Sequence, residues 1–276
     1  SLYSFRGGKT MRKILTIGGS DPFAGGGIQS DLKTFENFQL FGMSALTCVG
    51  MLDENNAFLL ENLPAKWLEQ QLASIQKMTD LAGIKIGLLH SLEAIMIVRD
   101  FLKKHPQIPI VLDPVLAFKE TTSLANQQYI ECLVKELFPL VDLVTPNLKE
   151  AALLFGKKKI SSINEVIETT KFIHTLGSKA VVVKGGSGIH GNEAIDVLYS
   201  HDGLTTFTME KLTRSTVNGA GCTFSSAITA NLVHGYTLPQ AIQRSKTYVY
   251  QCILNGVEMN DQTGSVWSGG NIKGGI

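Results

Sequence analysis

The sequence predicts an α/β protein with a mostly parallel central sheet that is covered by helices on both faces. Short β-rich runs alternate with helical stretches of about ten to fifteen residues along most of the chain. The apolar runs are short, as at residues 181–183, and are bounded by glycine or charge. No Pro/Ser-rich linker or charge block divides the chain, so we expect a single domain over residues 11–270.

The predicted strands are short apolar runs, several of which end at glycine or proline. They cover residues 14–18, 44–51, 83–88, 108–112, 143–144 and 180–184. The first strand runs directly into a glycine-rich turn, and the fourth ends at Asp113-Pro114. A hairpin is expected where two further runs, 194–199 and 204–209, flank His201-Asp202-Gly203.

The predicted helices have apolar residues at helical spacing. They cover residues 29–38, 67–78, 92–104, 126–138, 164–176, 222–235 and 239–255. The second places Leu68, Leu72 and Ile75 on one face, and Pro139 stops the fourth. Another helix opens at Asn147, which is a candidate cap, with Glu150 as its capping-box partner.

Charge, hydropathy and cysteine usage exclude several classes of protein. The formal net charge of +1 argues against a general attraction to nucleic acid or anionic membrane. No apolar stretch approaches the roughly 18 residues of a spanning helix. The four cysteines form no C-x-x-C pair, which favours reduced thiols in a cytoplasm. Residues 1–10 lack a signal-like apolar region, so we expect a tag or disordered extension before Met11.

Polar and glycine residues follow four of the predicted strands. They are the turn after Gly18, Asp113-Pro114, Asn147 and Lys184-Gly185-Gly186. Ligands of open parallel sheets bind at the carboxyl ends of the strands. We therefore expect these four segments to share one rim and to form a binding site there.

The first glycine-rich turn, residues 18–27, follows a strand and precedes a helix. It is not a Walker A loop, because no Gly-Lys-Ser/Thr follows. It is not a dinucleotide fingerprint either, because Ser30 stands where the third glycine is required. A tight turn explains part of the pattern, but five glycines favour a small-molecule pocket.

A second glycine-rich turn, Gly219-Ala220-Gly221-Cys222-Thr223, leads into a helix rich in small residues. Backbone N–H groups at a helix N-terminus form an anion site, which suits a phosphoryl group in transfer. The helix dipole should also lower the pKa of the Cys222 thiol. A helix cap with a packed cysteine is the alternative explanation.

Two carboxylates and a lysine complete a set of groups suited to phosphoryl transfer. Glu150 and Asp113 are candidates for the shell of a Mg²⁺ ion, which prefers oxygen ligands and keeps its waters. Lys184 can reach a phosphate as a point charge. A capping box, a strand-end turn and a surface lysine are the structural alternatives for these three residues.

Six ordered motifs resemble the ribokinase-like vitamin kinases, over residues 11–267. They lie at residues 15–21, 27–35, 111–115, 144–150, 183–186 and 219–224. The resemblance implies a ribokinase-like three-layer α/β/α sandwich, ATP and Mg²⁺ as cofactors, and a cytoplasmic homodimer. A flap over the substrate is expected at residues 116–126.

Within that family, the cysteine-containing turn is similar to two groups. One phosphorylates hydroxymethylpyrimidine or its phosphate in thiamine synthesis; the other comprises the Gram-positive-type pyridoxal/pyridoxine kinases of vitamin B6 salvage. Leu52-Asp53 stands where the thiamine group has Gln-Asn, and the Gly-Ala-Gly-Cys-Thr-Phe turn is similar to that of the B6 group. These features favour a B6 kinase. A pyrimidine kinase, a bifunctional enzyme and a non-catalytic ligand sensor on the same fold are the alternatives.

The resemblance also implies roles for particular residues. Cys222 is the expected general base, and the backbone of Gly219, Ala220 and Gly221 holds the phosphoryl group. The expected ATP site comprises Lys184, Asn147, Asp113, Gly186 and Thr223. The expected substrate site comprises Gly19, Asp21, Leu52, Asp31 and Val115.

The chain departs from the family at three positions. Asn218 stands where a His usually precedes the turn, and Phe23 where Ser is common. Phe118 replaces a flap cysteine of the B6 group, so a two-cysteine mechanism is not expected.

Overall fold

The computed structural model describes residues 10–116, 123–260 and 263–271. Its main sheet has nine strands in the order β3-β2-β1-β4-β5-β6-β7-β8-β9. The first five in the chain are β1 (Lys13–Ser20), β2 (Phe41–Leu52), β3 (Phe58–Asn62), β4 (Gly83–Ile86) and β5 (Ile110–Leu112). They are followed by β6 (Leu143–Val144), β7 (Ala180–Lys184), β8 (Glu193–Ser200) and β9 (Gly203–Glu210). All pairings from β2 to β7 are parallel, whereas β3, β8 and β9 join antiparallel, so the mostly parallel sheet is confirmed.

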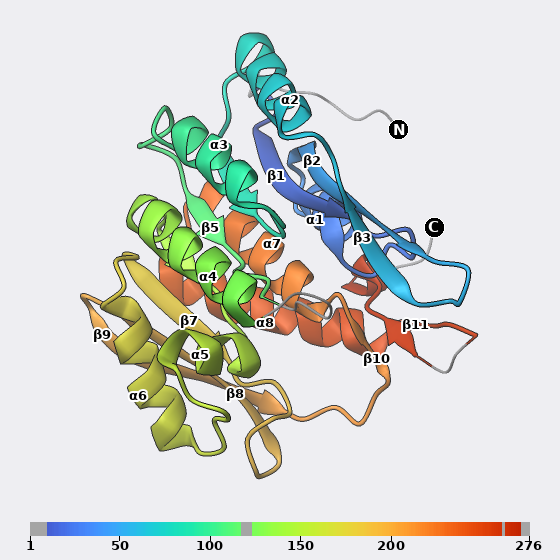
Figure 1. Ribbon diagram of the computed structural model, residues 1–276. Helices are drawn as coiled ribbons and strands as arrows, with labels where there is room; N and C mark the ends of the chain where they lie inside the picture. Colours follow the sequence, from blue (N-terminus) through green and yellow to red (C-terminus); the bar gives the residue numbers. More distant parts are fainter. Residues whose placement is uncertain (1–9, 117–122, 261–262, 272–276) are drawn as a thin grey trace, which may run out of the picture.

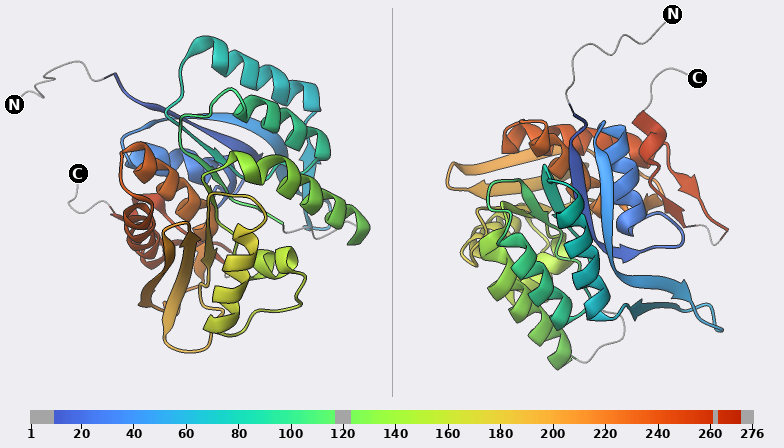
Figure 2. Two further views of the ribbon diagram at one scale, coloured as in Figure 1. Left: turned by 90° about the vertical axis from the view of Figure 1, so that its left-hand side faces the viewer. Right: turned by 90° about the horizontal axis from the view of Figure 1, so that it is seen from above.

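Helices cover both faces of this sheet (Figures 1 and 2). One layer contains α1 (Gly27–Asn37), α7 (Ala220–Val233) and α8 (Leu238–Leu254). The other contains α2 (Ala65–Met78), α3 (Leu92–Leu102), α4 (Ser123–Leu137), α5 (Leu148–Phe155) and α6 (Ile163–His174). The expected three-layer arrangement is therefore confirmed.

Alternation along the strands explains why both faces carry helices. Leu15 and Ile17 of β1 pack on the side of α2 to α6, whereas Ile14 packs with α1 and α7. Strand β7 divides in the same way: Val181 and Val183 face one layer and Val182 the other. A strand that is apolar at every position must be buried on both faces.

Among the described residues, helix α7 is the most enclosed helix. Every residue from Thr223 to Asn231 is buried, because α1 and α8 flank the helix and the sheet lies beneath it. Its small side chains allow this close packing. Thr237 begins α8 through a capping box with Gln240, as the Thr-x-x-Gln spacing dictates.

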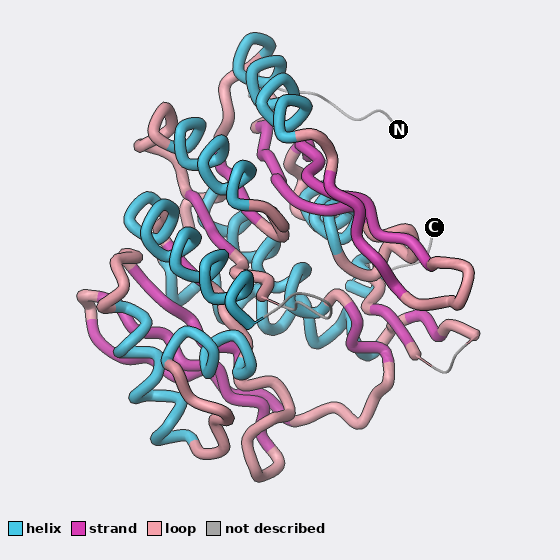
Figure 3. Tube along the Cα trace, viewed as in Figure 1, coloured by secondary structure: helices cyan, strands magenta, loops and turns pink. Residues whose placement is uncertain are grey.

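Several elements were not predicted. The edge strand β3 pairs with the end of β2, and a small second sheet forms from β10 (Thr216–Asn218), β12 (Gly264–Ser265) and β11 (Val257–Glu258), as Figure 3 shows. These strands are two to five residues long, so their sequences carry little periodicity. Residues 117–122 of the expected flap, including Phe118, lie outside the described residues, as do 1–9 of the expected extension. Within the described part of the chain, no helix is long and apolar enough to cross a membrane.

Candidate active site at the carboxyl edge of the sheet

The carboxyl ends of the parallel strands meet along one edge of the sheet. Strands β1, β4, β5, β6 and β7 are parallel neighbours in that order. The four segments expected to share a rim therefore do so. A parallel β-bridge between Asn147 and Lys184 joins two of these segments. The N–H of Lys184 donates to the carbonyl of Pro146 at 2.9 Å.

The two glycine-rich turns touch, although about 200 residues separate them in the sequence. Gly219 has a positive φ of 84°, and a Cβ atom placed on it would lie 1.5 Å from the carbonyl oxygen of Gly25. A Cβ atom on Gly26 would lie 3.8 Å from both Asp21 Oδ2 and Cys222 Sγ. The contact therefore brings the first turn against the thiol at the start of α7.

Asp21 shapes the first turn. Its Oδ1 accepts the N–H of Phe23 at 2.9 Å, and its Oδ2 accepts the N–H of Gly26 at 2.9 Å. Its own N–H donates to Gln29 Oε1 in α1. Asp21 therefore fixes the loop that faces Cys222.

Lys184 lies over the first turn of α7. A Cβ atom on Gly221 would lie 3.1 Å from Lys184 Nζ. The ammonium group and the free N–H groups of the helix N-terminus thus point into one region, which favours an anion there. Burial lowers the pKa of Lys184, but Asp113 and Glu150 outweigh it, so the lysine is positively charged.

Asp113 and Glu150 are both buried beside Lys184. Lys184 Nζ donates to Asp113 Oδ1 at 3.2 Å. Burial raises the pKa of Glu150 to about 7, Lys184 opposes this, and the negative charge of Asp113 adds to it. Two carboxylates that repel each other beside a phosphate site can share a hydrated cation, which fits the water-rich shell of Mg²⁺. The described residues contain no cluster of three or more protein ligands that would hold a metal alone.

Cys222 Sγ lies between the N-termini of two helices. It belongs to the first turn of α7, and it accepts a hydrogen bond from the N–H of Gly27, the first residue of α1. Burial nevertheless raises the pKa of the thiol to about 11, and Lys85 opposes this shift only in part. The expectation that the helix terminus lowers the pKa of Cys222 is therefore wrong, because desolvation outweighs it.

Comparison with known proteins identifies the family. The model of the phosphomethylpyrimidine kinase family matches residues 21–267. The chain belongs to this family. The predicted resemblance to ribokinase-like vitamin kinases is thereby confirmed, and the chain is a kinase.

Two relatives of this kinase carry different substrate names. The pyridoxine kinase of Bacillus subtilis is 34% identical over 257 residues, which cover 92% of this chain and 95% of the relative. A hydroxymethylpyrimidine/phosphomethylpyrimidine kinase of Staphylococcus aureus is 34% identical over 253 residues, 91% of each chain. The ADP complex of Bacillus subtilis pyridoxal kinase has a TM-score of 0.89 at 33% identity and covers 95% of this chain and 98% of that one.

Two residues that were expected to contact ligands instead form buried hydrogen bonds within this kinase. The side chain of Asp31 is 1% exposed, and its oxygens accept hydrogen bonds from Lys85, Thr16 and Ser226. Thr223 is fully buried, and its hydroxyl bonds Ser30 Oγ at 2.8 Å. The structure therefore corrects both assignments: these side chains hold the helices together and do not line the ligand site.

The remaining predicted residues lie along the edge of the sheet. Asn147 is exposed and forms a capping box with Glu150. The helix cap that the sequence offered as the structural explanation for these two residues is therefore present. Gly186 has a positive φ and open space beside it. Val115 is half-buried next to Asp113, and its N–H donates to the carbonyl of Asp113.

Gly19 and Leu52 lie on the first two strands. A Cβ atom on Gly19 would lie 2.7 Å from the Sγ of buried Cys48, so a larger residue does not fit there. Leu52 ends β2 opposite Phe58 and is 46% exposed. Its side chain is therefore available at the outer end of the β2–β3 pair.

The polar residues beneath the site were not predicted from the sequence. Lys85 is 1% exposed, and Thr145 and Ser225 join the end of β6 to α7 through a 2.6 Å hydrogen bond. A signal existed for Lys85, because a lysine interrupts the apolar strand Gly83-Ile84-Lys85-Ile86. A charged residue in a strand buried on both faces requires a buried partner.

Proposed function

We propose that this chain is a pyridoxal kinase that transfers the γ-phosphate of ATP to the 5′-hydroxymethyl group of pyridoxal, pyridoxine or pyridoxamine. The observation that carries the proposal is the convergence of the Cys222 thiol, the N-terminus of α7 and the Lys184 ammonium group. A general base beside an anion site is what phosphoryl transfer to an alcohol requires. Solved pyridoxal kinases from Staphylococcus aureus, with TM-scores of 0.88 and 0.87, are complexes with AMP-PCP and with pyridoxal.

The choice of vitamin B6 rests on two observations. The pyridoxal kinases among the similar structures have TM-scores of 0.86 to 0.89, whereas the phosphomethylpyrimidine kinase of Clostridium difficile has 0.73 at similar identity. Leu52 also offers no hydrogen-bond partner to an aminopyrimidine, where the resemblance predicts Gln in the thiamine group. A site that lacks such a partner discriminates against the substrate that needs it.

The proposed reaction uses the residues as follows. The substrate ring lies against Gly19, Asp21, Leu52 and Val115, and its hydroxymethyl oxygen faces Cys222. The Cys222 thiolate accepts the hydroxyl proton while the oxygen attacks the γ-phosphorus, and the bond to the leaving ADP oxygen breaks. Backbone N–H groups of residues 219–222 and the Lys184 ammonium group stabilise the charge on the transferred phosphoryl group. Asn147 and Gly186 lie beside the remaining phosphates.

Asp113 and Glu150 are the residues that would hold Mg²⁺, through water. The ion would supply charge neutralisation on the β- and γ-phosphates. Asp113 is already held by Lys184, so its carboxylate is oriented before nucleotide binds.

The second candidate is a hydroxymethylpyrimidine/phosphomethylpyrimidine kinase, or an enzyme with both activities. The family description and the Staphylococcus aureus relative at 34% identity favour it. The deciding experiment compares kcat/KM for pyridoxal, pyridoxine and hydroxymethylpyrimidine with ATP. We expect at least a tenfold preference for the B6 vitamers, the difference that about 1.4 kcal/mol of selective binding gives. A preference for the pyrimidine would overturn the proposal, and no ATP turnover on any of them would indicate a ligand sensor.

We also propose a homodimer, as the family resemblance implies. Strand β3 is an edge of the main sheet and carries the partly exposed Phe58 opposite Leu52. Light scattering coupled to size exclusion would measure the mass in solution against the 30.0 kDa of one chain.

A further inference from the structure

A buried polar layer lies directly beneath Cys222, where α1 and α7 run side by side. Three contacts join the two helices in register: Gly27 with Cys222, Ser30 with Thr223, and Asp31 with Ser226. Cys222 and Ser226 are four residues apart and so lie on the same face of α7. The Asp31 contact is therefore one helical turn below the thiol.

Asp31 is paired with a buried lysine of the central sheet. Lys85 Nζ lies 3.0 Å and 2.9 Å from Asp31 Oδ1 and Oδ2, and both side chains are 1% exposed. Thr16 Oγ1 donates to Asp31 Oδ2 at 2.6 Å. The pair thus joins β1, β4, α1 and α7 at one point, immediately under the site.

Stability alone does not explain a pair of buried charges. Removing two charges from water costs several kcal/mol per ion, and well-packed apolar residues often replace such pairs without loss. Burial is the largest single influence and lowers the pKa of Lys85, but the negative charges of Asp31, Cys222 and Asp113 and the hydrogen bond to Asp31 together outweigh it. Lys85 is therefore a permanent positive charge whose neighbours include both the thiol and a site carboxylate.

Several charged groups surround Cys222. Lys85 and Lys184 favour its ionised form; Asp31, Asp113 and Asp21 oppose it. Lys85 has the largest influence of these charges on the thiol, ahead of Asp113 and Asp31. Lys184 is bound to Asp113 and faces the phosphate region. Lys85, in the polar layer beneath Cys222, is therefore the cation that can stabilise a negative charge on the thiol.

We propose that Lys85 is a positioning residue for the reaction: its ammonium group, oriented by Asp31, stabilises the Cys222 thiolate that accepts the substrate proton. The inference rests on the proposed role of Cys222 as general base. Asp31 fixes the position of the charge, and the Ser226 and Thr223 contacts fix the helix that carries the thiol.

The test measures the rate of Cys222 alkylation by iodoacetamide at pH 9 without added ligands. Peptide mass spectrometry separates Cys222 from Cys48, Cys132 and Cys252. Lys85→Met/Asp31→Asn removes both charges, and since Lys85 has the larger influence on the thiol, the rate should fall about three- to tenfold. Lys85→Arg keeps both charges, so its rate should stay close to that of the unaltered protein. A rate that falls only when the positive charge is lost is not expected from a purely structural role.

A second buried pair provides the matched control. Lys246 Nζ lies 2.7 Å from Asp196 Oδ2, joining α8 to β8, and Asp196 Oδ1 accepts the N–H of Gly185. Lys246→Met/Asp196→Asn should leave the alkylation rate of Cys222 at pH 9 unchanged. Equal rates in the unaltered protein and Lys85→Met/Asp31→Asn, or an equal fall in Lys85→Arg, would overturn the inference.

If Lys85→Met/Asp31→Asn does not fold, Lys85→Gln/Asp31→Asn replaces it, since two amides can keep a hydrogen bond without either charge, and the same fall in rate is required. The readout uses neither vitamin nor ATP. A protein that shows the expected rates but phosphorylates no B6 vitamer would refute the proposed substrate and leave standing the effect of Lys85 on the thiolate.

Discussion

Cys222 combines two opposing influences within one side chain. Its position between the N-termini of α1 and α7 favours negative charge, whereas burial raises the pKa of the thiol to about 11. Below that pKa the thiolate fraction rises about tenfold per pH unit. The pH dependence of turnover therefore reports whether the thiolate takes part.

We expect kcat/KM for pyridoxine to rise between pH 7 and pH 9. Cys222→Ala should lower kcat by about 10²- to 10⁴-fold and abolish this rise, because the general base is lost. Cys222→Asp should retain more activity than Cys222→Ala, with a flat profile, because a carboxylate is already ionised at these pH values. Steady-state kinetics across the range measure all three. Near-full turnover in Cys222→Ala would remove the thiol from the proposed mechanism.

Glu150 should make the free energy of unfolding fall as pH rises. Its pKa is about 7 in the folded protein and 4.5 ordinarily, so the folded state binds more protons between these values. Its stabilising contribution is present below pH 4.5 and is lost as pH rises through 7. Between pH 5.5 and 8.5 the unaltered protein should lose about 2 kcal/mol relative to Glu150→Gln. Urea unfolding without Mg²⁺ or nucleotide measures the difference.

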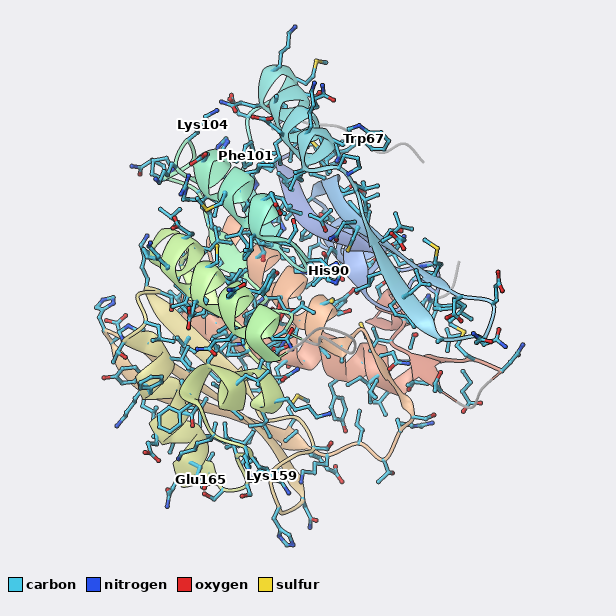
Figure 4. The ribbon with its side chains drawn as sticks, viewed as in Figure 1. Trp67, His90, Phe101, Lys104, Lys159 and Glu165 are labelled. Atoms are coloured by element: carbon cyan, nitrogen blue, oxygen red, sulfur yellow. The ribbon has the colours of Figure 1, made fainter. Side chains whose placement is uncertain are left out.

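Glu165→Gln is the matched control for that experiment. Glu165 occupies the same capping-box position at the start of α6, on the outer surface (Figure 4). Hydrogen bonds from the backbone of Ser161 and Ser162 lower its pKa, so its charge does not change between pH 5.5 and 8.5. If both variants gained a similar free energy of unfolding over the unaltered protein at pH 8.5, loss of charge at a cap, and not burial of Glu150, would be the cause.

At the scale of elements, helix α7 is flanked by two left-handed glycines in different surroundings. Gly219 has a φ of 84° and meets the backbone of Gly25, whereas Gly235 has a φ of 89° and nothing within 4 Å of an added Cβ. Gly235→Ala should cost about 1–2 kcal/mol from backbone strain and keep normal kcat/KM. Gly219→Ala carries the same strain and must also separate the two turns, so kcat/KM should fall about 10²-fold or more. Thermal unfolding and kinetics of both variants measure this, and equal activities would contradict the proposed site.

The order of strands and helices was predictable because it depends on local periodicity, and so was the shared edge of the strands that form the site. The use of individual side chains was less predictable. Asp31 and Thr223 lie in motifs of the family, yet each is buried against a segment distant in the sequence, Lys85 or Ser30. Which of two neighbouring polar residues faces the ligand depends on how α1 and α7 are rotated against each other, and sequence spacing alone does not determine that. Strand β3 was missed because its pairing partner, not its own pattern, creates it.

At the scale of the whole molecule, the site joins segments from both ends of the chain. The first turn lies on β1 and α1, the carboxylates follow β5 and β6, Lys184 ends β7, and Cys222 begins α7. A ligand that contacts all of them binds only the folded state. Nucleotide binding should therefore raise the unfolding temperature through linkage.

A non-hydrolysable ATP analogue with Mg²⁺, at about 100 times its Kd, should stabilise the fold by about 2.7 kcal/mol. For a protein of this size that corresponds to roughly 5–10 °C in Tm. Lys184→Met removes a charge-assisted contact to phosphate, so at the same concentration the shift should fall to less than half. Lys179→Met is the control, because Lys179 lies just before the other end of the same strand, β7, and its exposed ammonium group pairs with Asp142. Since each shift is measured against the ligand-free form of the same variant, any intrinsic loss of stability cancels. Equal shifts in Lys184→Met and Lys179→Met would place the nucleotide phosphates away from the α7 terminus.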